Sequence, residues 1–372
     1  MKINKTFKKV LKKVVNKEIL DYMVKISNVL TLSNIRELIE LKLLMWKGMI
    51  GKNVTERRKP HVLFVTEKWC DCNPSLGTTY NAHGLFGSLE ASGLATQDKF
   101  HPDEYRLQNG RPFDIALLLK CMKSKPDLII LTWPGTPELK TLEIIKERIQ
   151  IPMVALWWDS VNHMEEAESF LPFVELNVVV DSATAYLQKT HQPEKYMPMW
   201  TPWDSRIFYN PNLNRDIEVC FVGTMANHPD RVAGISALKA NGVNVCQTGG
   251  QRECRVPVDE YTRIYMRSKI ALNFCYHSNL IAQCKGRVFE ATLCGAMLME
   301  AENSETARWF EPMVDYVPFT NETDLIEKVK YYLSHDSERM EIAGRGHHKA
   351  KERYTGEIFW KNVFRKIFSE KF

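Results

Sequence analysis

The feature that most constrains the fold is an alternation of short apolar runs with helical stretches, which begins near residue 60. Four runs in the first half are rich in aliphatic and β-branched residues, as buried strands are: residues 61–67, 126–133, 151–160 and 176–182. A helical pattern at 138–149 separates two of these runs. Because parallel strands are joined by crossovers, usually helices, this order predicts a parallel sheet with right-handed crossovers.

A second alternation follows in the other half of the chain. Strands are expected at 217–223, 243–249 and 269–275, with helices near 229–240 and 258–267. The segment KGRVFEATLCGAMLME, from residue 285, supplies a further helix and strand, and helical patterns dominate from residue 322. Residues 196–216, which carry three prolines and two tryptophans, are interpreted as an ordered linker. These patterns predict an α/β protein with two α/β units in tandem.

The N-terminal residues, 1–58, are expected to form a separate basic amphipathic helical segment. Residues 1–60 contain 15 Lys and Arg against five Asp and Glu, a net charge of +10, whereas the remaining residues carry −5. Such a helix suits an anionic membrane surface, although a helix that packs on the body with solvated lysines fits the pattern equally well. The remaining chain has a negative balance and does not indicate nucleic-acid binding.

Composition and missing motifs exclude several classes. No apolar run is long enough for a transmembrane helix, and the first residues lack the pattern of a secretory signal. Nine scattered cysteines without a CxxC pair indicate reduced thiols in the cytoplasm and no structural zinc. Neither a Walker A loop, nor a strand-linked GxGxxG, nor a DxD-like pair for a cation is found, so neither a metal site nor a bound cofactor is expected.

Candidate site residues follow from the rule that ligands bind beyond the carboxyl ends of parallel strands. Lys285 and Arg287 open a helix whose free N–H groups favour phosphate, and Glu290 could accept two ribose hydroxyls. The alternative is an ordinary surface helix with an Arg287–Glu290 pair. His83 and Asp159 are candidates for proton transfer, and both could instead be packing or helix-capping residues.

Several of these segments together resemble a known family. EVCFVGTMANHPDRVAGISAL, YMRSKIALNF, KGRVFEATLCGAMLME and the region from VPFTNETDL to residue 355 occur in the order and spacing of group-1-type glycosyltransferases of the GT-B fold, with most similarity to the CgeB-like spore-maturation branch. The resemblance covers residues 217–355 and implies two Rossmann-like domains that face each other across a cleft. It implies an acceptor domain at 59–200, a linker at 201–216, a nucleotide-sugar donor domain at 217–345 and a C-terminal helix at 346–372.

The resemblance also assigns roles to residues. It implies that Glu290 holds the donor ribose, and that Lys285, Arg287, Gly223 and Arg231 approach the donor diphosphate. Many group-1 enzymes carry a second glutamate near the donor sugar, but Ala282 occupies that position here. This departure leaves both the stereochemical outcome and the sugar open.

The expected function is a metal-independent, cytoplasmic hexosyltransferase that uses a nucleotide-sugar and builds a surface polysaccharide or glycoconjugate. The acceptor would be a glycan, a lipid-linked glycan or a protein, and the basic N-terminal segment would hold the enzyme on the inner face of the membrane. If the reaction inverts, His83 or Asp159 would act as the base. The alternatives are a non-catalytic nucleotide-sugar or glycan-binding protein on the same scaffold and a nucleotide-sugar epimerase.

Overall fold

A computed structural model describes Glu37, Glu40 and residues 59–80, 83–110, 112–132, 135–158, 163–180, 183–249, 256–275 and 281–368. The chain forms two compact units, one made of Met1–Gly77, Ala95–Ala155 and Pro172–Glu175 and the other of Thr78–Leu94, Leu156–Leu171 and Leu176–Phe372. Except for Glu37 and Glu40, the expected N-terminal helices lie outside the described residues. The domain boundaries expected from the sequence stay a prediction.

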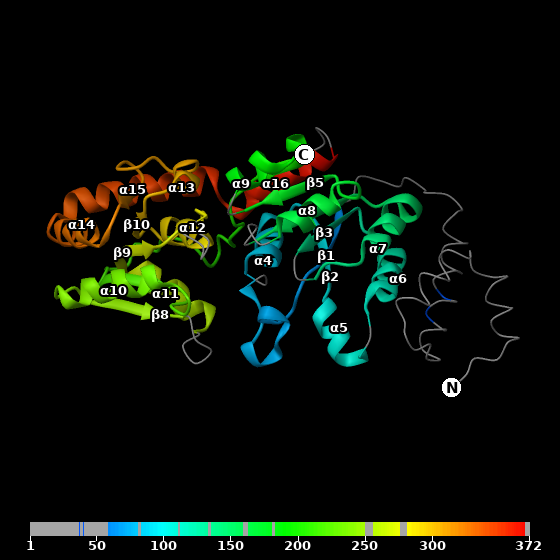
Figure 1. The fold of residues 1–372 in the computed structure, drawn as a ribbon, viewed down its shortest axis with the longest axis horizontal. Helices are drawn as coiled ribbons and strands as arrows, with labels where there is room; N and C mark the ends of the chain where they lie inside the picture. Colours follow the sequence, from blue (N-terminus) through cyan, green and yellow to red (C-terminus); the bar gives the residue numbers. More distant parts are fainter. Residues whose placement is uncertain are drawn as a thin grey trace, which may run out of the picture. The chain divides into compact units, whose positions relative to one another are not determined.

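The first sheet has six parallel strands in the order β2-β1-β3-β4-β5-β6 (Figure 1). Its strands are β1 (His61–Val65), β2 (Thr96–Phe100), β3 (Leu128–Thr132), β4 (Met153–Trp157), β5 (Leu176–Val179) and β6 (Tyr196–Pro198). Every residue of β3, β4 and β5 is buried. These three central strands correspond to continuous apolar runs in the sequence because strands covered on both faces need apolar side chains throughout.

The second sheet has five parallel strands in the order β11-β10-β9-β7-β8. Its strands are β7 (Ile217–Val222), β8 (Val245–Thr248), β9 (Ser268–Asn273), β10 (Met297–Ala301) and β11 (Val317–Phe319). In both sheets the first strand lies between the second and the third, so each has the doubly wound order in which the chain switches direction beside its first strand. In the second sheet this switch point lies between β7 and β9.

Helices cover the second sheet on both faces because its strands present apolar side chains to both. Val219 and Phe221 of β7 belong to a buried cluster with residues of α10 (Pro229–Ala240) and α14 (Glu322–Ser334). Alternate strand residues point to the other face, where α11 (Val258–Arg267) and α12 (Gly286–Leu293) pack on β7, β9 and β10. Within the described residues, no helix is both long and apolar enough to cross a bilayer.

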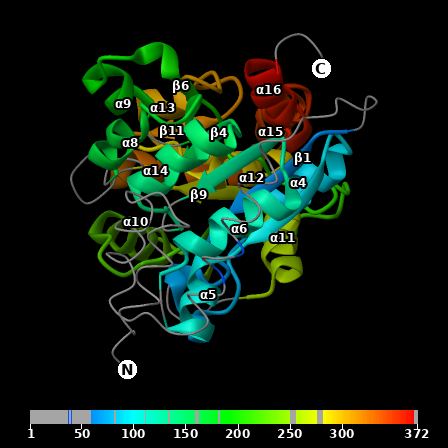
Figure 2. The same ribbon diagram turned by 90° about the vertical axis from the view of Figure 1, so that its right-hand side faces the viewer.

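The remaining helices complete the two units (Figures 1 and 2). They are α4 (Leu85–Ser92), α5 (Pro102–Asn109), α6 (Asp114–Ser124), α7 (Leu139–Ile144), which continues as a π-helix (Ile145–Ile149), α8 (Met164–Phe170), α9 (Ala183–Lys189), α13 (Ser304–Ala307), α15 (Asp336–Arg353) and α16 (Gly356–Phe368). Short 3-10 turns occupy Cys70–Cys72, Pro74–Leu76 and Pro193–Lys195. The eight described cysteines form no disulfide, and five of them are buried.

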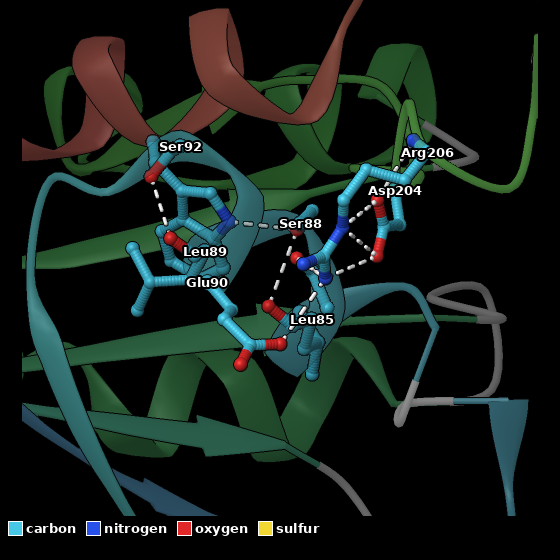
Figure 3. A network of polar contacts seen from close by, with 9 residues as sticks. Leu85, Ser88, Leu89, Glu90, Ser92, Asp204 and Arg206 are labelled. Carbon is cyan, nitrogen blue, oxygen red and sulfur yellow. Dashed lines mark hydrogen bonds and ion pairs between the residues drawn. The ribbon is translucent and has the colours of Figure 1, made fainter.

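The last helix, α16, packs against α4, which is far from it in the sequence. The Trp360 indole donates a 2.8 Å hydrogen bond to Ser88 Oγ, and a Cβ placed at Gly356 would lie 2.4 Å from the Cβ of Ser88. Glycine at 356 therefore allows the two helices to approach this closely. Beside this contact, Arg206 joins the buried carboxylate of Asp204 to Glu90 and to the Gly87 carbonyl of α4 (Figure 3).

The predicted strand and helix order is confirmed for the segments that the sequence pattern identified, but three strands were not expected: β11, at the edge of the second sheet, and β2 and β6, at the two edges of the first. Thr96–Phe100, with the sequence TQDKF, forms the polar and partly exposed edge strand β2. Strand β6 has three residues, ends at Pro198 and lies at the other edge, inside the segment interpreted as a linker. Edge strands are partly solvated and tolerate proline, so neither shows the apolar signal that identified the inner strands.

Candidate functional site

The switch point of the second sheet brings together residues from three segments. Gly223 directly follows β7, and the buried Asn273 ends β9. Helix α12 begins at Gly286 with Lys285 as its N-cap residue. A switch point in an open parallel sheet leaves a crevice beyond the strand ends, which is where such folds bind ligands. The site expected from the sequence therefore has a place in the fold that suits ligand binding.

Arg287, in the first turn of α12, is held against the ends of β7 and β9. Its Nε donates a 2.9 Å hydrogen bond to Asn273 Oδ1, and its guanidinium lies 5.5 Å from the centre of the Phe221 ring. A Cβ built on Gly223 would lie 2.7 Å from Arg287 Nη1, so a side chain at 223 would displace the guanidinium. Glycine at the end of β7 thus makes room for the arginine.

A second guanidinium approaches the same ring from α10. Arg231 is 2% exposed, donates a 2.7 Å hydrogen bond to the Thr224 carbonyl, and lies 5.8 Å from the centre of the Phe221 ring. Burial lowers the pKa of His228, and the positive charges of Arg231, Lys285 and Arg287 lower it further. The four predicted residues Gly223, Arg231, Lys285 and Arg287 therefore surround one electropositive region, which suits an anion such as phosphate.

Glu290 lies one turn further into α12 and is 3% exposed. Its Oε2 accepts a hydrogen bond from the hydroxyl of Tyr261 in α11. Burial raises the pKa of Glu290 to about 7, while the Tyr261 hydrogen bond and the positive charge of Arg287 act in the opposite direction. A carboxylate in such a setting binds hydroxyl donors strongly because few water molecules compete.

Two residues of the segment 196–216 contact the start of α12. Trp203 Nε1 donates a 3.3 Å hydrogen bond to the Gly286 carbonyl. A Cβ on Gly286 would lie 3.2 Å from both Thr201 Oγ1 and the Trp203 ring. The first turn of α12, which carries Arg287, is thereby held by residues distant in the sequence.

Of the two predicted catalytic residues, His83 and Asp159, only His83 belongs to the described residues. His83 is half-buried before α4, and its carbonyl accepts a 3.1 Å hydrogen bond from the Asp204 N–H. Burial lowers the pKa of His83, whereas the negative charges of Asp204 and Asp259 raise it. The His83 N–H donates a 2.9 Å hydrogen bond to the Tyr80 carbonyl, and the Tyr80 ring contacts the Tyr261 ring, with centroids 5.6 Å apart. Asp159 lies outside the described residues.

Sequence reasoning missed Tyr261 and Asn273, which bond to Glu290 and Arg287, and also Glu300, which bonds to Asn273 behind them. Asn273 lies in the second half of the strand predicted at 269–275, and Glu300 follows the apolar run AMLM, so both lie near the carboxyl end of a predicted strand. That rule could have identified them, but neither is next to a motif. Within the described ranges, no group of three or more His, Cys, Asp or Glu side chains is arranged to hold a metal ion.

Comparisons with known proteins agree with this geometry. Residues 222–364 match a family described as glycosyl transferase-like, and this range includes β8 to β11 and the residues from Gly223 to Glu290. No curated protein sequence matches the chain.

Several solved structures are similar in fold. HepE from Anabaena, in complex with UDP and glucose, has 11% identity and a TM-score of 0.54, with 84% of this chain and all of that chain covered. A glycosyltransferase from Rickettsia africae has 11% identity and a TM-score of 0.54, with 85% and 100% covered. Sucrose-phosphate synthase from Thermosynechococcus elongatus has 10% identity and a TM-score of 0.56, with 84% and 100% covered. The expected α/β fold of the GT-B type, with two parallel sheets, is confirmed.

Proposed function

We propose that this chain is a glycosyltransferase that takes a sugar from a nucleotide-sugar donor, and that the α12 site binds the donor. The observation that carries this proposal is the convergence of Arg287, Gly223 and the buried Glu290 at the switch point of the second sheet. The guanidinium suits a diphosphate and the carboxylate suits ribose hydroxyls. The family matched by residues 222–364 is described as glycosyl transferase-like, and HepE, which is similar in fold, has a structure with UDP and glucose.

The proposed chemistry follows from charge development in the reaction. When the bond between sugar and diphosphate breaks, negative charge grows on the leaving phosphate. Arg287, Arg231, Lys285 and the N–H groups at the start of α12 would stabilise this charge as fixed donors, so we propose a metal-independent reaction without a cofactor. If the reaction inverts at the sugar, His83 or Asp159 would take the proton of the acceptor hydroxyl.

The acceptor and the cellular setting are further parts of the proposal. We infer a hexosyltransferase of the CgeB-like branch that acts on a glycan, a lipid-linked glycan or a protein during synthesis of a surface polysaccharide or glycoconjugate. The basic segment 1–57 would keep the enzyme on the inner face of a membrane, in the cytoplasm. The positive charge of the N-terminal segment supports the membrane location, and the resemblance of residues 217–355 to group-1-type glycosyltransferases supports the type of reaction.

A second candidate function has one specific observation in its favour. Ala282 stands at the position that carries a glutamate in many group-1 enzymes, so one polar group expected near the donor sugar is missing. A nucleotide-sugar-binding protein without turnover would retain Glu290 and Arg287 and dispense with that glutamate. Binding of a nucleotide-sugar without hydrolysis or transfer, even with acceptor extracts, would favour this second function.

The test of the donor site combines ligand binding with two substitutions. Thermal unfolding with UDP-, GDP-, ADP- and CMP-sugars identifies the base, because a ligand that binds only the folded chain raises the melting temperature. With the selected nucleotide, Arg287→Ala and Glu290→Ala are each expected to weaken binding by about tenfold or more, as the loss of hydrogen bonds to charged groups does. The exposed Glu341→Ala serves as the control. Unchanged affinity and turnover in both site variants would show that the donor binds elsewhere.

A further inference from the structure

A buried carboxylate lies behind the candidate site and takes no direct part in it. Glu300 of β10 is directly opposite Asn273 of β9 in the sheet register, and neither side chain is exposed. Asn273 Nδ2 donates a 2.7 Å hydrogen bond to Glu300 Oε1. Glutamate is almost never fully buried without a partner, so a carboxyl group at this position needs a reason.

Asn273 connects this carboxyl group to Arg287. The amide of an asparagine donates through its nitrogen and accepts through its oxygen. Since Glu300 accepts from Nδ2, the oxygen of the amide is turned towards Arg287, where Oδ1 accepts the 2.9 Å hydrogen bond from Nε. A reversed amide would place its nitrogen against the guanidinium, where two donors would meet, and its oxygen against the ionised carboxylate, where two acceptors would meet. Glu300 therefore determines which end of Asn273 meets the arginine.

This arrangement occupies only one nitrogen of the guanidinium. Nη1 lies next to Gly223, and Nη2 is buried with no hydrogen-bond acceptor among the described residues. A buried N–H group without an acceptor is costly, more so on a charged group. An oxyanion is the ligand that would satisfy both Nη atoms at once.

We propose that Glu300 and Asn273 form a positioning relay that holds Arg287 by its Nε and presents its two Nη atoms to the diphosphate of the donor. The proposal rests on the proposed function and assigns roles to two residues that do not themselves touch the donor. Asn273 orients the guanidinium, and Glu300 orients Asn273.

The order of the relay also keeps negative charge away from the anion site. A carboxylate in direct contact with Arg287 would neutralise it and compete with phosphate, whereas here an uncharged amide separates the two groups. Burial raises the pKa of Glu300 to about 8, while hydrogen bonds, including the one from Asn273, and the charge of Arg287 act in the opposite direction. Both the neutral and the ionised carboxyl group retain an oxygen that accepts from Asn273.

The relay is tested with inorganic pyrophosphate as the probe, because this anion needs no choice of nucleotide base. Calorimetric titration of the full chain compares the wild type with Glu300→Met and Glu300→Gln. Methionine removes the acceptor but fills a similar volume in the core, whereas glutamine restores an acceptor oxygen. Glu300→Met is expected to bind pyrophosphate about tenfold more weakly, and Glu300→Gln within about threefold of the wild type, as one charge-assisted contact would predict.

Two further variants keep the outcome decisive. Asn273→Asp places a carboxylate directly on Arg287 and is expected to weaken pyrophosphate binding more than Glu300→Met. This variant tests the relay even if Glu300→Met does not fold. Glu305 is buried but contacts the Thr184 N–H instead, so Glu305→Gln is the matched control and should bind normally.

The outcomes for the relay and for the proposed transferase function can be told apart. Unchanged pyrophosphate affinity in Glu300→Met or Asn273→Asp, or no binding of pyrophosphate to the wild type, overturns the relay. If the wild type binds pyrophosphate through the relay but binds neither UDP, GDP nor ADP more tightly than pyrophosphate, the relay stands and the transferase proposal fails.

Discussion

At the scale of single residues, the site depends on how Glu290 is kept available. Its carboxyl group is buried against Tyr261 and Tyr265 of α11, with Arg287 on its own helix. Burial favours the neutral form, and the Tyr261 hydrogen bond together with the charge of Arg287 favours the ionised form, which is the form that would accept ribose hydroxyls in the proposed reaction. Tyr261 is therefore expected to support donor binding through Glu290, although no sequence motif identified it.

Replacement of Tyr261 by phenylalanine should change the pH dependence of donor binding. The pKa of Glu290, raised to about 7 by burial, should rise further without the Tyr261 hydrogen bond, by about one unit for the loss of a bond to a charged group. Nucleoside binding should weaken as pH falls through the pKa of Glu290, and the midpoint should lie at higher pH in Tyr261→Phe. Titration with the matching nucleoside between pH 5.5 and 8.5 measures this midpoint.

The same shift predicts the direction of a stability change. Because the pKa of Glu290 in the folded chain is above that of an unfolded glutamate, stabilisation from the protonated form is complete at low pH and is lost as pH rises through about 7. Tyr261→Phe should extend this loss to higher pH, as urea unfolding at several pH values would show. An identical binding midpoint in the wild type and Tyr261→Phe would contradict the role given to Tyr261.

The residues that could be predicted are those whose chemistry is local. Arg287 and Glu290 stand at helical spacing near a helix start, and Gly223 ends an apolar run, so their positions made them candidates, whereas their proposed roles came from the family resemblance. In the sequence, Glu300 is a polar residue that follows the apolar run AMLM. Its burial and its bond to Asn273 come from the register of β9 and β10, which no spacing along the chain reveals.

At the scale of elements, the described inner strands and the helices of the second sheet could be predicted because apolar periodicity identifies elements with a buried face. The contact of α16 with α4 could not be predicted, since the first residues of the two helices, Leu85 and Gly356, are 271 positions apart in the sequence. It depends on Gly356 and on the pairing of Trp360 with Ser88. These are tertiary contacts between small and aromatic residues, which leave no periodic signal.

Removal of the Ser88 hydroxyl should destabilise this helix pair. Ser88 Oγ accepts the 2.8 Å hydrogen bond from the fully buried Trp360 indole, so Ser88→Ala leaves that N–H without this acceptor and should cost about 1–3 kcal/mol. Ser92 on the same helix donates to the Leu89 carbonyl (Figure 3) and accepts from the Leu94 N–H, both local bonds, so Ser92→Ala is the control. Chemical unfolding gives the free energies.

A double-mutant cycle isolates the pair itself. In a Trp360→Phe background the indole N–H is absent, so Ser88→Ala should cost much less there than in the wild type. An equal cost in both backgrounds would mean that Ser88 acts on α4 alone, through its bond to the Leu85 carbonyl, and does not tie α16 to it.

At the scale of the whole molecule, charge is divided along the chain. Residues 1–60 hold 15 of the 50 Lys and Arg but only five of the 45 Asp and Glu. The residues after position 60 thus carry a net negative charge, which an anionic surface would repel. Residues 1–60 carry the positive charge that such a surface would attract. Any binding to an anionic membrane should therefore depend on this segment and should not be a general property of the chain.

Sedimentation with liposomes tests this division of charge. The full chain should bind vesicles that contain anionic lipid, and removal of residues 1–57 should abolish that binding, because each basic residue near such a surface contributes about 1 kcal/mol. Replacement of Lys8, Lys9, Lys12 and Lys13 by glutamine keeps the apolar spacing and separates charge from hydrophobic insertion. Binding to neutral vesicles should stay weak throughout. If the truncated chain binds anionic vesicles as well as the full chain does, the membrane role of the segment is wrong, whereas the donor site, which lies wholly in other residues, is unaffected.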